Sequence, residues 1–277
     1  MTQLLGFPSA AHPHQVCLLK KAIYSLKQAP RAWYSIFSTF LLSQGFINSH
    51  CDNSLFIQRI TSTIIIVLVY VDDILVTSSN SSHIVSLIAH MHTVFSMKEL
   101  GNISYFLGVS INDCSDSYFL SQHKYASEIL LQAGMANCKP CNSPSSVKPS
   151  LSSDSHIPFS QPELYRSIVG VLQYLTITRP DLSFSVNQAC QHMHAPTVGH
   201  FASVKRLLQF IQGPLTHGLT FSPSSFDLQV FSNSSWAGDV LNRPSTSGYC
   251  VYLGSNLISW SAKKITHSAS FLHRGRI

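Results

Sequence analysis

The sequence contains little charge. Only 11% of its 277 residues are Asp, Glu, Lys or Arg, against about a quarter in an average soluble domain. Residues 1–50 hold no acid, although they contain four bases, Lys20, Lys21, Lys27 and Arg31. The net charge of +6 favours a polyanionic partner such as nucleic acid. A solvated basic helix end explains the basic N-terminal stretch equally well.

The sequence also lacks the patterns of disulfide-rich, zinc-binding and membrane proteins. Its seven cysteines are odd in number and scattered, and the pair Cys138 and Cys141 has no second pair to complete four zinc ligands. The His-x-His pairs at 90–92 and 192–194 lie in helical patterns where their side chains diverge, so we interpret them as surface histidines. Without a visible N-terminal signal or an apolar run near the roughly 18 residues of a membrane span, we expect an intracellular protein of undetermined compartment with no membrane partner.

The most informative feature is the aspartate pair Asp72 and Asp73. It lies between the apolar runs 64–69 and 74–77, which predict two buried strands joined by a tight Asp-Asp turn. Carboxylates at the tip of a buried hairpin need a neutralising cation. Mg²⁺ prefers such hard oxygen ligands, and two-metal phosphoryl transfer uses them. On turn chemistry alone, a solvated Asp-Asp turn is an equally good interpretation.

The remaining pattern predicts an α+β fold. Helical periodicity covers 20–44, and Pro30 within it predicts two shorter helices. Ser82 is expected to cap the next helix, with apolar positions up to Phe95, and a Ser- and Pro-rich stretch at 137–161 predicts a linker. Strands are predicted at 54–60, 103–111, 118–122, 219–222, 228–233, 249–253 and 257–261, and further helices at 124–133, 163–176, 180–193 and 200–211.

Five blocks of sequence carry a family resemblance. They are residues 20–34, which contain LKQAPRAWY; the YVDD motif at 70–73; and the blocks at 95–108, 164–181 and 245–261. In this order they resemble the Pol polyprotein of copia-type LTR retrotransposons, over nearly the whole chain. The chain is therefore similar to a truncated copy of that polyprotein.

The resemblance implies a particular α+β architecture: a partial reverse-transcriptase palm and fingers with an antiparallel sheet, a helical thumb or connection, and an incomplete RNase H-like β-sheet. The implied divisions are residues 1–136 for the partial reverse transcriptase, 137–161 for the linker, 162–215 for the helical connection and 216–277 for the truncated RNase H-like region.

The resemblance also implies site residues and partners. The implied partners are an RNA or DNA template-primer and other Pol segments. The implied residues are Asp72 and Asp73 as catalytic Mg²⁺ ligands, Lys27, Gln28, Arg31 and Tyr70 at the nucleotide or template, and Phe106, Leu107 and Gly108 as primer grip. Each of these assignments has a structural alternative. The nucleotide-binding block could be an ordinary helix surface, Tyr70 could be a core aromatic, and the primer-grip residues could be a strand with a bulge.

The chain lacks acids that the resembling enzymes use. Their third polymerase aspartate comes from an earlier palm strand, but the only acid before Tyr70 is Asp52, at a peripheral position. We expect the first catalytic motif to be missing and the chain to be inactive alone. In the RNase H-like block, Asn233 and Ser235 replace aspartates, and residues 265–277 contain no acid and resemble a decayed or frameshifted end. RNase H activity is therefore expected to be absent.

Two alternatives remain open. A non-catalytic basic remnant that binds nucleic acid would show strong salt dependence without a Mg²⁺ requirement. A decayed element would have no function and would fold marginally.

Overall fold

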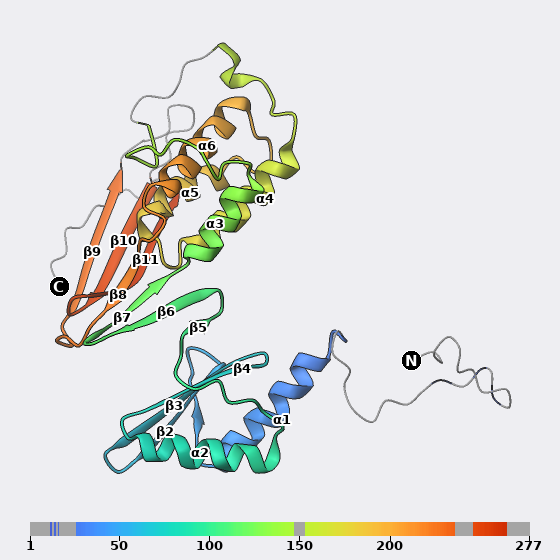
Figure 1. Cartoon of the computed structure of the whole chain (residues 1–277), viewed down its shortest axis with the longest axis vertical. Helices are drawn as coiled ribbons and strands as arrows, with labels where there is room; N and C mark the ends of the chain where they lie inside the picture. The colour runs from blue at the N-terminus through green and yellow to red at the C-terminus, as the bar shows by residue number, and fades with distance from the viewer. Residues whose placement is uncertain are drawn as a thin grey trace. The chain divides into compact units, whose positions relative to one another are not determined.

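The computed structural model describes residues 12, 14, 16, 26–146, 153–235 and 246–264. The chain divides into two compact units, residues 1–101 and 102–277, and each is described by itself (Figure 1). Both units combine helices with antiparallel sheets, so the predicted α+β class is confirmed. Within the described residues, no helix is both long and apolar enough to cross a membrane.

The first unit is one sheet packed against two helices. Its sheet has the order β1-β2-β3-β4, with every neighbouring pair antiparallel. Alternate residues of β3, including Val67 and Val69, are buried with Phe37 and Met91 of the two helices, so the helices cover one face of the sheet. The elements are α1 (Ala29–Ser43), β1 (Ile47–Asn48), β2 (Leu55–Ile60), β3 (Thr63–Tyr70), β4 (Asp73–Ser78) and α2 (Ser81–Val94).

The two helices of this unit begin where their first residues favour a helix start. Helix α1 begins at Ala29, so Pro30 lies in its first turn, where a missing N–H costs nothing. The predicted stretch 20–25 lies outside the described residues. The cap of α2 is Asn80, not Ser82, because Asn80 Oδ1 accepts the Ser82 N–H at 3.0 Å.

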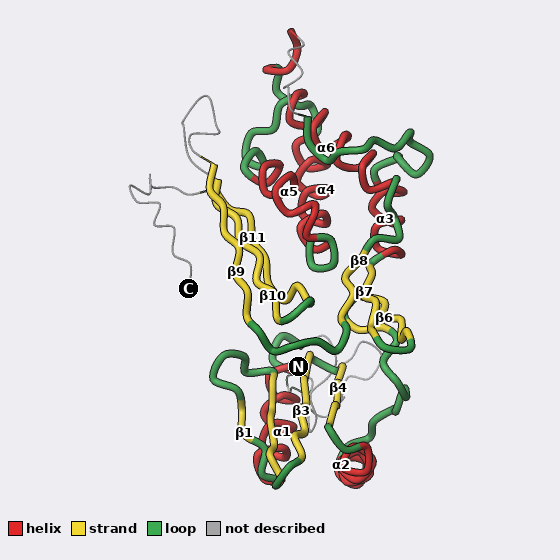
Figure 2. The backbone as a smooth tube through the Cα atoms, turned by 90° about the vertical axis from the view of Figure 1, so that its left-hand side faces the viewer, coloured by secondary structure: helices red, strands yellow, loops and turns green. Residues whose placement is uncertain are grey.

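The second unit contains two antiparallel sheets beside a group of helices (Figure 2). The sheets have the orders β5-β6-β7-β8 and β11-β10-β9. Its elements are β5 (Tyr105–Phe106), β6 (Val109–Cys114), β7 (Ser117–Ser121), α3 (His123–Gln132), the 3₁₀ helix η1 (Ser153–His156), α4 (Pro162–Leu175), the 3₁₀ helix η2 (Pro180–Leu182), α5 (Ser183–Cys190), α6 (Val198–Gln212), β8 (Gly218–Phe221), β9 (Leu228–Ser235), β10 (Thr246–Leu253) and β11 (Asn256–Lys264).

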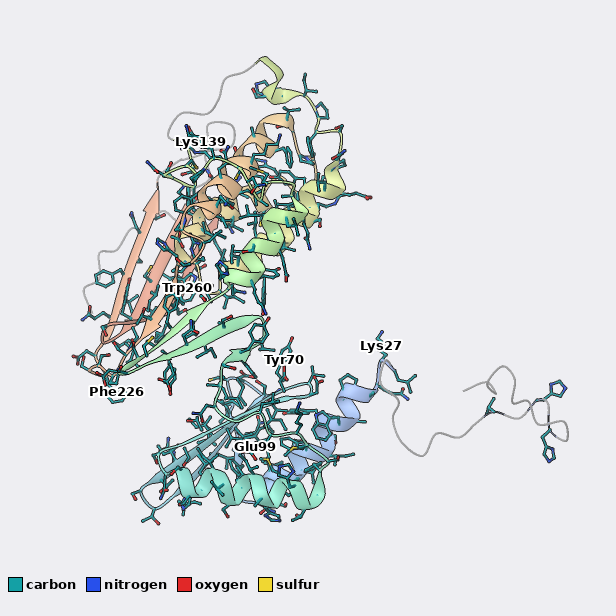
Figure 3. The ribbon with its side chains drawn as sticks, in the orientation of Figure 1. Lys27, Tyr70, Glu99, Lys139, Phe226 and Trp260 are labelled. Carbon is teal, nitrogen blue, oxygen red and sulfur yellow. The ribbon has the colours of Figure 1, made fainter. Side chains whose placement is uncertain are left out.

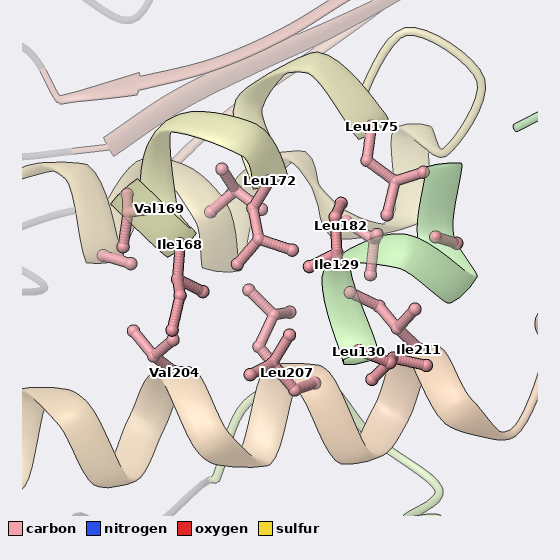
Figure 4. Packing of buried hydrophobic residues seen from close by; sticks show 14 of the residues in the cluster. Ile129, Leu130, Ile168, Val169, Leu172, Leu175, Leu182, Val204, Leu207 and Ile211 are labelled. Atoms are coloured by element: carbon pink, nitrogen blue, oxygen red, sulfur yellow. The ribbon is translucent and has the colours of Figure 1, made fainter. Parts of the chain in front are cut away.

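One apolar core joins the helices of the second unit. Ile129 of α3, Leu172 of α4 and Leu207 of α6 belong to the same buried cluster, shown in Figure 4. The Trp260 indole of β11 donates a hydrogen bond to the Thr176 carbonyl oxygen at 3.1 Å, which attaches the β9–β11 sheet to the end of α4. Trp260 is labelled in Figure 3.

The prediction of a single strand at 103–111 is wrong. A two-residue turn, Leu107 and Gly108, divides it into β5 and β6, and Phe106 pairs with Val109. Both turn residues have positive φ, +47° and +72°. The error has a physical cause, because Leu-Gly is not among the usual Asn-Gly or Asp-Gly signals of such turns.

The prediction of one helix at 180–193 is also wrong, because the structure has a short 3₁₀ helix followed by a shorter α-helix. Pro180 opens the short 3₁₀ helix η2, and α5 ends at Cys190. After Cys190 the N–H groups of His192 and Met193 bond three residues back, to Ala189 and Cys190, so the helix tightens and stops.

The second unit is closed by contacts between distant segments. β8 pairs with β7, from Tyr118 opposite Phe221 to Ser121 opposite Gly218. Helix α3 shares its core with α4 and α6. Residues on both sides of the predicted linker at 137–161 therefore belong to one folded body. The functional divisions at 1–136, 162–215 and 216–277, and the palm, fingers and thumb assignments, stay predictions.

Candidate active site and nucleic-acid surface

The aspartate pair lies at the tip of the β3–β4 hairpin. Tyr70 pairs with Asp73 across the two strands, so the loop consists of Val71 and Asp72. The predicted Asp-Asp turn is therefore displaced by one residue, because Asp73 is the first residue of β4.

The tip of this hairpin is strained and is held by a tryptophan. Val71 has φ +52°, a conformation that is costly for a β-branched residue. Its carbonyl oxygen accepts a hydrogen bond from the Trp33 indole of α1 at 2.6 Å. Trp33 is itself fixed by stacking on Phe37, with ring centroids 5.3 Å apart. Helix α1, which carries most of the LKQAPRAWY block, thus sets the position of the aspartate loop.

Both aspartates are exposed, so the expectation that they need a cation to offset burial is wrong. Carboxylates in water are stable without a metal ion. Asp72 and Asp73 are the donor type that Mg²⁺ prefers. However, the described residues contain no group of three His, Cys, Asp or Glu side chains able to hold a metal. The two aspartates therefore fit part of a metal site, not a complete one.

Asp52 forms local hydrogen bonds and is not close in sequence to the aspartate pair. Its Oδ1 accepts hydrogen bonds from the Ser54 N–H at 2.8 Å and from the Ser54 hydroxyl at 2.6 Å. These bonds stabilise the charged form and lower the pKa of Asp52. The carboxylate forms a turn ahead of β2, which agrees with the peripheral position expected for it.

The predicted nucleotide- and template-binding residues are all on the surface of the first unit. Lys27, Gln28 and Arg31 are exposed at the start of α1, and Lys27 extends from that end of the helix in Figure 3. Tyr70 is 53% exposed, which excludes the alternative that it is a core aromatic. Tyr70 is paired with Asp73 across the two strands, and its side chain is open to solvent.

The predicted primer-grip residues form a tight hairpin in the second unit, not a bulged strand. Phe106, Leu107 and Gly108 are half-buried at the β5–β6 turn. The Tyr174 hydroxyl of α4 donates a hydrogen bond to the Leu107 carbonyl oxygen. The grip turn is therefore attached to the helical part of its own unit.

The sheet β11-β10-β9, for which the resemblance implies an RNase H-like role, has Asn233 and Ser235 on its edge strand β9. Asn233 of β9 is exposed and pairs with Gly248, and Ser235 pairs with Thr246. Residues 236–245 and residues 265–277, which include the predicted decayed end, lie outside the described residues.

Comparison with known proteins identifies the class. The profile of the reverse transcriptase (RNA-dependent DNA polymerase) family matches residues 1–147. The chain belongs to this family. No solved structure matches it.

Particular relatives narrow the class to copia-type retrotransposon Pol polyproteins. The chain is 43% identical over 265 residues to the retrovirus-related Pol polyprotein from transposon RE2 of Arabidopsis thaliana, covering 95% of the chain and 18% of the relative. It is 34% identical over 274 residues to the corresponding polyprotein from transposon TNT 1-94 of Nicotiana tabacum, covering 95% of the chain and 21% of the relative. It is also 48% identical over 198 residues to an uncharacterized mitochondrial protein of Arabidopsis thaliana, covering 71% of the chain and 82% of that protein. The chain thus corresponds to a reverse transcriptase segment, about a fifth of the Pol polyproteins it matches.

Two residues that hold the candidate loops, one in each unit, were not identified from the sequence. Trp33 and Tyr174 both lie inside blocks that carry the family resemblance, but nothing in the sequence indicates the hydrogen-bond partner of either side chain. Their hydrogen bonds, to Val71 and Leu107, join segments 38 and 67 residues apart. Only a tertiary structure can reveal such pairs.

Proposed function

We propose that this chain supplies part of the centre for RNA-directed DNA synthesis, with Asp72 and Asp73 as two of the ligands for Mg²⁺. The observation that carries the proposal is the Trp33–Val71 hydrogen bond at 2.6 Å. It fixes the aspartate loop against the helix whose first residues would contact nucleotide or template.

The start of α1 is suited to a phosphate-bearing ligand. Lys27 and Arg31 are exposed there, without an acidic residue in the first turn of the helix. The partial positive charge of a helix N-terminus adds to these two side-chain charges. Gln28 makes no side-chain cap to the helix, so its amide is available to a ligand. An RNA or DNA template-primer is the proposed partner.

The proposed metal site needs a ligand from outside the described residues. Enzymes of the reverse transcriptase family use divalent metal ions, and two-metal nucleotidyl transfer requires carboxylates from more than one segment. Asp52 is bound to Ser54, and it is the only acid before Tyr70. The chain alone is therefore proposed to be inactive as a polymerase, and other Pol segments are the proposed source of the missing ligand.

Primer extension on an RNA template with Mg²⁺ tests both parts of this proposal. We expect no extension by the chain alone. We expect extension after fusion to the preceding segment of the RE2 polyprotein, and its loss in the fusion carrying Asp72→Asn and Asp73→Asn. Extension by the chain alone that Asp72→Asn abolishes would refute the proposed inactivity. A fusion whose activity survives both substitutions would refute the assigned ligands.

The RNase H-like sheet is proposed to be inactive in RNA cleavage. Asn233 is neutral, so it cannot balance a divalent cation as an aspartate does. The test is cleavage of RNA in an RNA–DNA hybrid, with no product expected. Product that disappears in an Asn233→Ala variant would contradict this proposal.

A further inference from the structure

Tyr174 of α4 makes a contact to the β5–β6 turn that neither strand of the hairpin can provide. Its hydroxyl donates to the Leu107 carbonyl oxygen, across 67 residues of sequence. Leu107 is half-buried, and the carbonyl belongs to a loop of only two residues. The bond therefore connects a helix of the core directly to the tip of a hairpin.

The turn has a conformational reason to need this support. Leu107 has φ +47°, a left-handed conformation that leucine rarely adopts. Two-residue turns of this kind normally use Asn or Asp at this first position, because those side chains tolerate positive φ. With leucine there, the local sequence does not favour the turn, and a tertiary contact must compensate.

Gly108 packs closely against the Tyr174 ring. A Cβ atom at Gly108 would lie 3.2 Å from Tyr174 Cε1 and 3.3 Å from its hydroxyl oxygen. A side chain at this position would be strained at φ +72° and would require the ring to shift, so glycine favours the close approach. The Tyr174 ring also contacts the Tyr125 ring of α3 edge to face, with centroids 5.3 Å apart.

We propose that Tyr174 is a positioning residue for the primer grip: it fixes the Leu107–Gly108 turn in the orientation in which the turn contacts a primer strand. The primer contact rests on the proposed function, because that function supplies the template-primer, while the family resemblance gives the turn the primer-grip role. The positioning itself rests on the hydroxyl bond and on the close packing of the ring against Gly108.

The first experiment tests the positioning with a matched pair of variants of the full chain. Tyr174→Phe removes the hydroxyl and keeps the ring. Tyr165→Phe is the control, because Tyr165 on the same helix donates a hydrogen bond to the Ala189 carbonyl oxygen at 2.8 Å, away from the turn. We expect the amide resonances of Leu107 and Gly108 to shift in Tyr174→Phe but not in Tyr165→Phe. Unchanged amide resonances in Tyr174→Phe would overturn the proposal.

A second substitution separates positioning from general loss of stability. Leu107→Asn supplies a residue that tolerates positive φ, so the turn no longer depends on tertiary support. Tyr174→Phe should speed hydrogen exchange at the amide of Val109, which pairs with Phe106 across the turn. Addition of Leu107→Asn should return this exchange rate to the wild-type value. Failure of this rescue would mean that the hydroxyl does not act through the turn conformation.

The second experiment measures affinity for an RNA template annealed to a fluorescent DNA primer. Loss of one neutral hydrogen bond should weaken binding about 3- to 10-fold in Tyr174→Phe, whereas Tyr165→Phe should bind as the wild type does. An equal loss in both variants would overturn the primer-positioning proposal. Absence of binding by the wild type would instead contradict the proposed function, and the amide resonances would still decide whether Tyr174 positions the turn.

Discussion

The Trp33 ring meets the Phe95 ring edge to face, with centroids 5.4 Å apart, while its indole N–H holds the Val71 carbonyl. One side chain thus belongs both to the apolar core of the first unit and to the aspartate loop. This dual position allows the two contributions to be separated by substitution.

Trp33→Phe keeps a ring in the core and removes the hydrogen bond. We expect a loss of about 1 kcal/mol in the free energy of unfolding from the bond, and faster amide exchange at Asp72. Urea denaturation followed by circular dichroism, together with hydrogen exchange, measures both. Phe40→Leu, which alters the same aromatic cluster without touching Val71, is the control. Equal exchange at Asp72 in the two variants would contradict the attachment.

Val71→Gly should stabilise the protein. The substitution removes a β-branched residue from φ +52°, a conformation that costs about 1–3 kcal/mol, and the lost side chain is 47% exposed. Glycine entropy offsets about 0.5–1 kcal/mol of this gain. Val85→Gly, at an exposed position of α2, should destabilise by about 0.3–0.5 kcal/mol, because glycine is a somewhat poorer helix former than valine. We expect the urea midpoint to rise above the wild-type value in Val71→Gly and to fall below it in Val85→Gly. A fall in both variants would mean that Val71 is not strained.

Arg179→Ala should destabilise the second unit strongly. Arg179 is only 2% exposed, bonds Asp181 through two nitrogens at 2.9 and 2.8 Å, and donates to the Pro214 carbonyl at 2.9 Å. Breaking a buried pair costs about 3–5 kcal/mol. We expect a loss near the lower end of that range, because Asp181 is 40% exposed and can be solvated. Arg166→Ala, at an exposed position of α4, should change the urea midpoint little. Similar losses in both variants would argue against a special position for Arg179.

His200 should make stability fall in acid. Burial, and to a smaller extent the neighbouring His192, lower the pKa of His200 to about 4 from its usual 6.5. Its Nδ1 accepts the Thr197 N–H at 3.1 Å as part of a capping box, and only the unprotonated nitrogen can accept. The stabilising contribution is thus complete above pH 6.5 and declines as the pH falls towards 4.

His200→Gln should remove this pH dependence, because glutamine offers a cap acceptor that does not titrate. Thermal unfolding between pH 4 and 6.5 measures the slope. His50→Gln, at an exposed position of the first unit, should leave the slope unchanged. If the His200 variant retains the wild-type slope, another group causes the acid sensitivity.

The sequence predicted local features well where a single hydrophobic periodicity or a single turn residue determines them. The alternating burial of β3 follows its apolar run, and Gly134 has φ +66° at the end of α3. Prediction was wrong where the local signal was ambiguous. Asn80 and Ser82 are both good cap residues, and Leu107 gives no sign that it must adopt positive φ.

The sequence predicted which residues form the candidate site, but not their exposure or their contacts. The aspartate pair was found from its apolar flanks, whereas its exposure depends on tertiary packing, which leaves the tip of the hairpin outside the buried cluster of the first unit. The contacts Trp33–Val71 and Tyr174–Leu107 depend on tertiary packing across many residues, which no periodicity encodes.

The pairing of β7 with β8 has a consequence for synthesis on the ribosome. All strand pairs of the first unit join segments that are close in sequence, so that unit can fold soon after residue 101 leaves the exit tunnel. β7 must wait with an open edge until residues 218–221 have been translated. Throughout this interval the nascent chain presents unpaired backbone groups at Tyr118 and Leu120 to chaperones and to neighbouring chains.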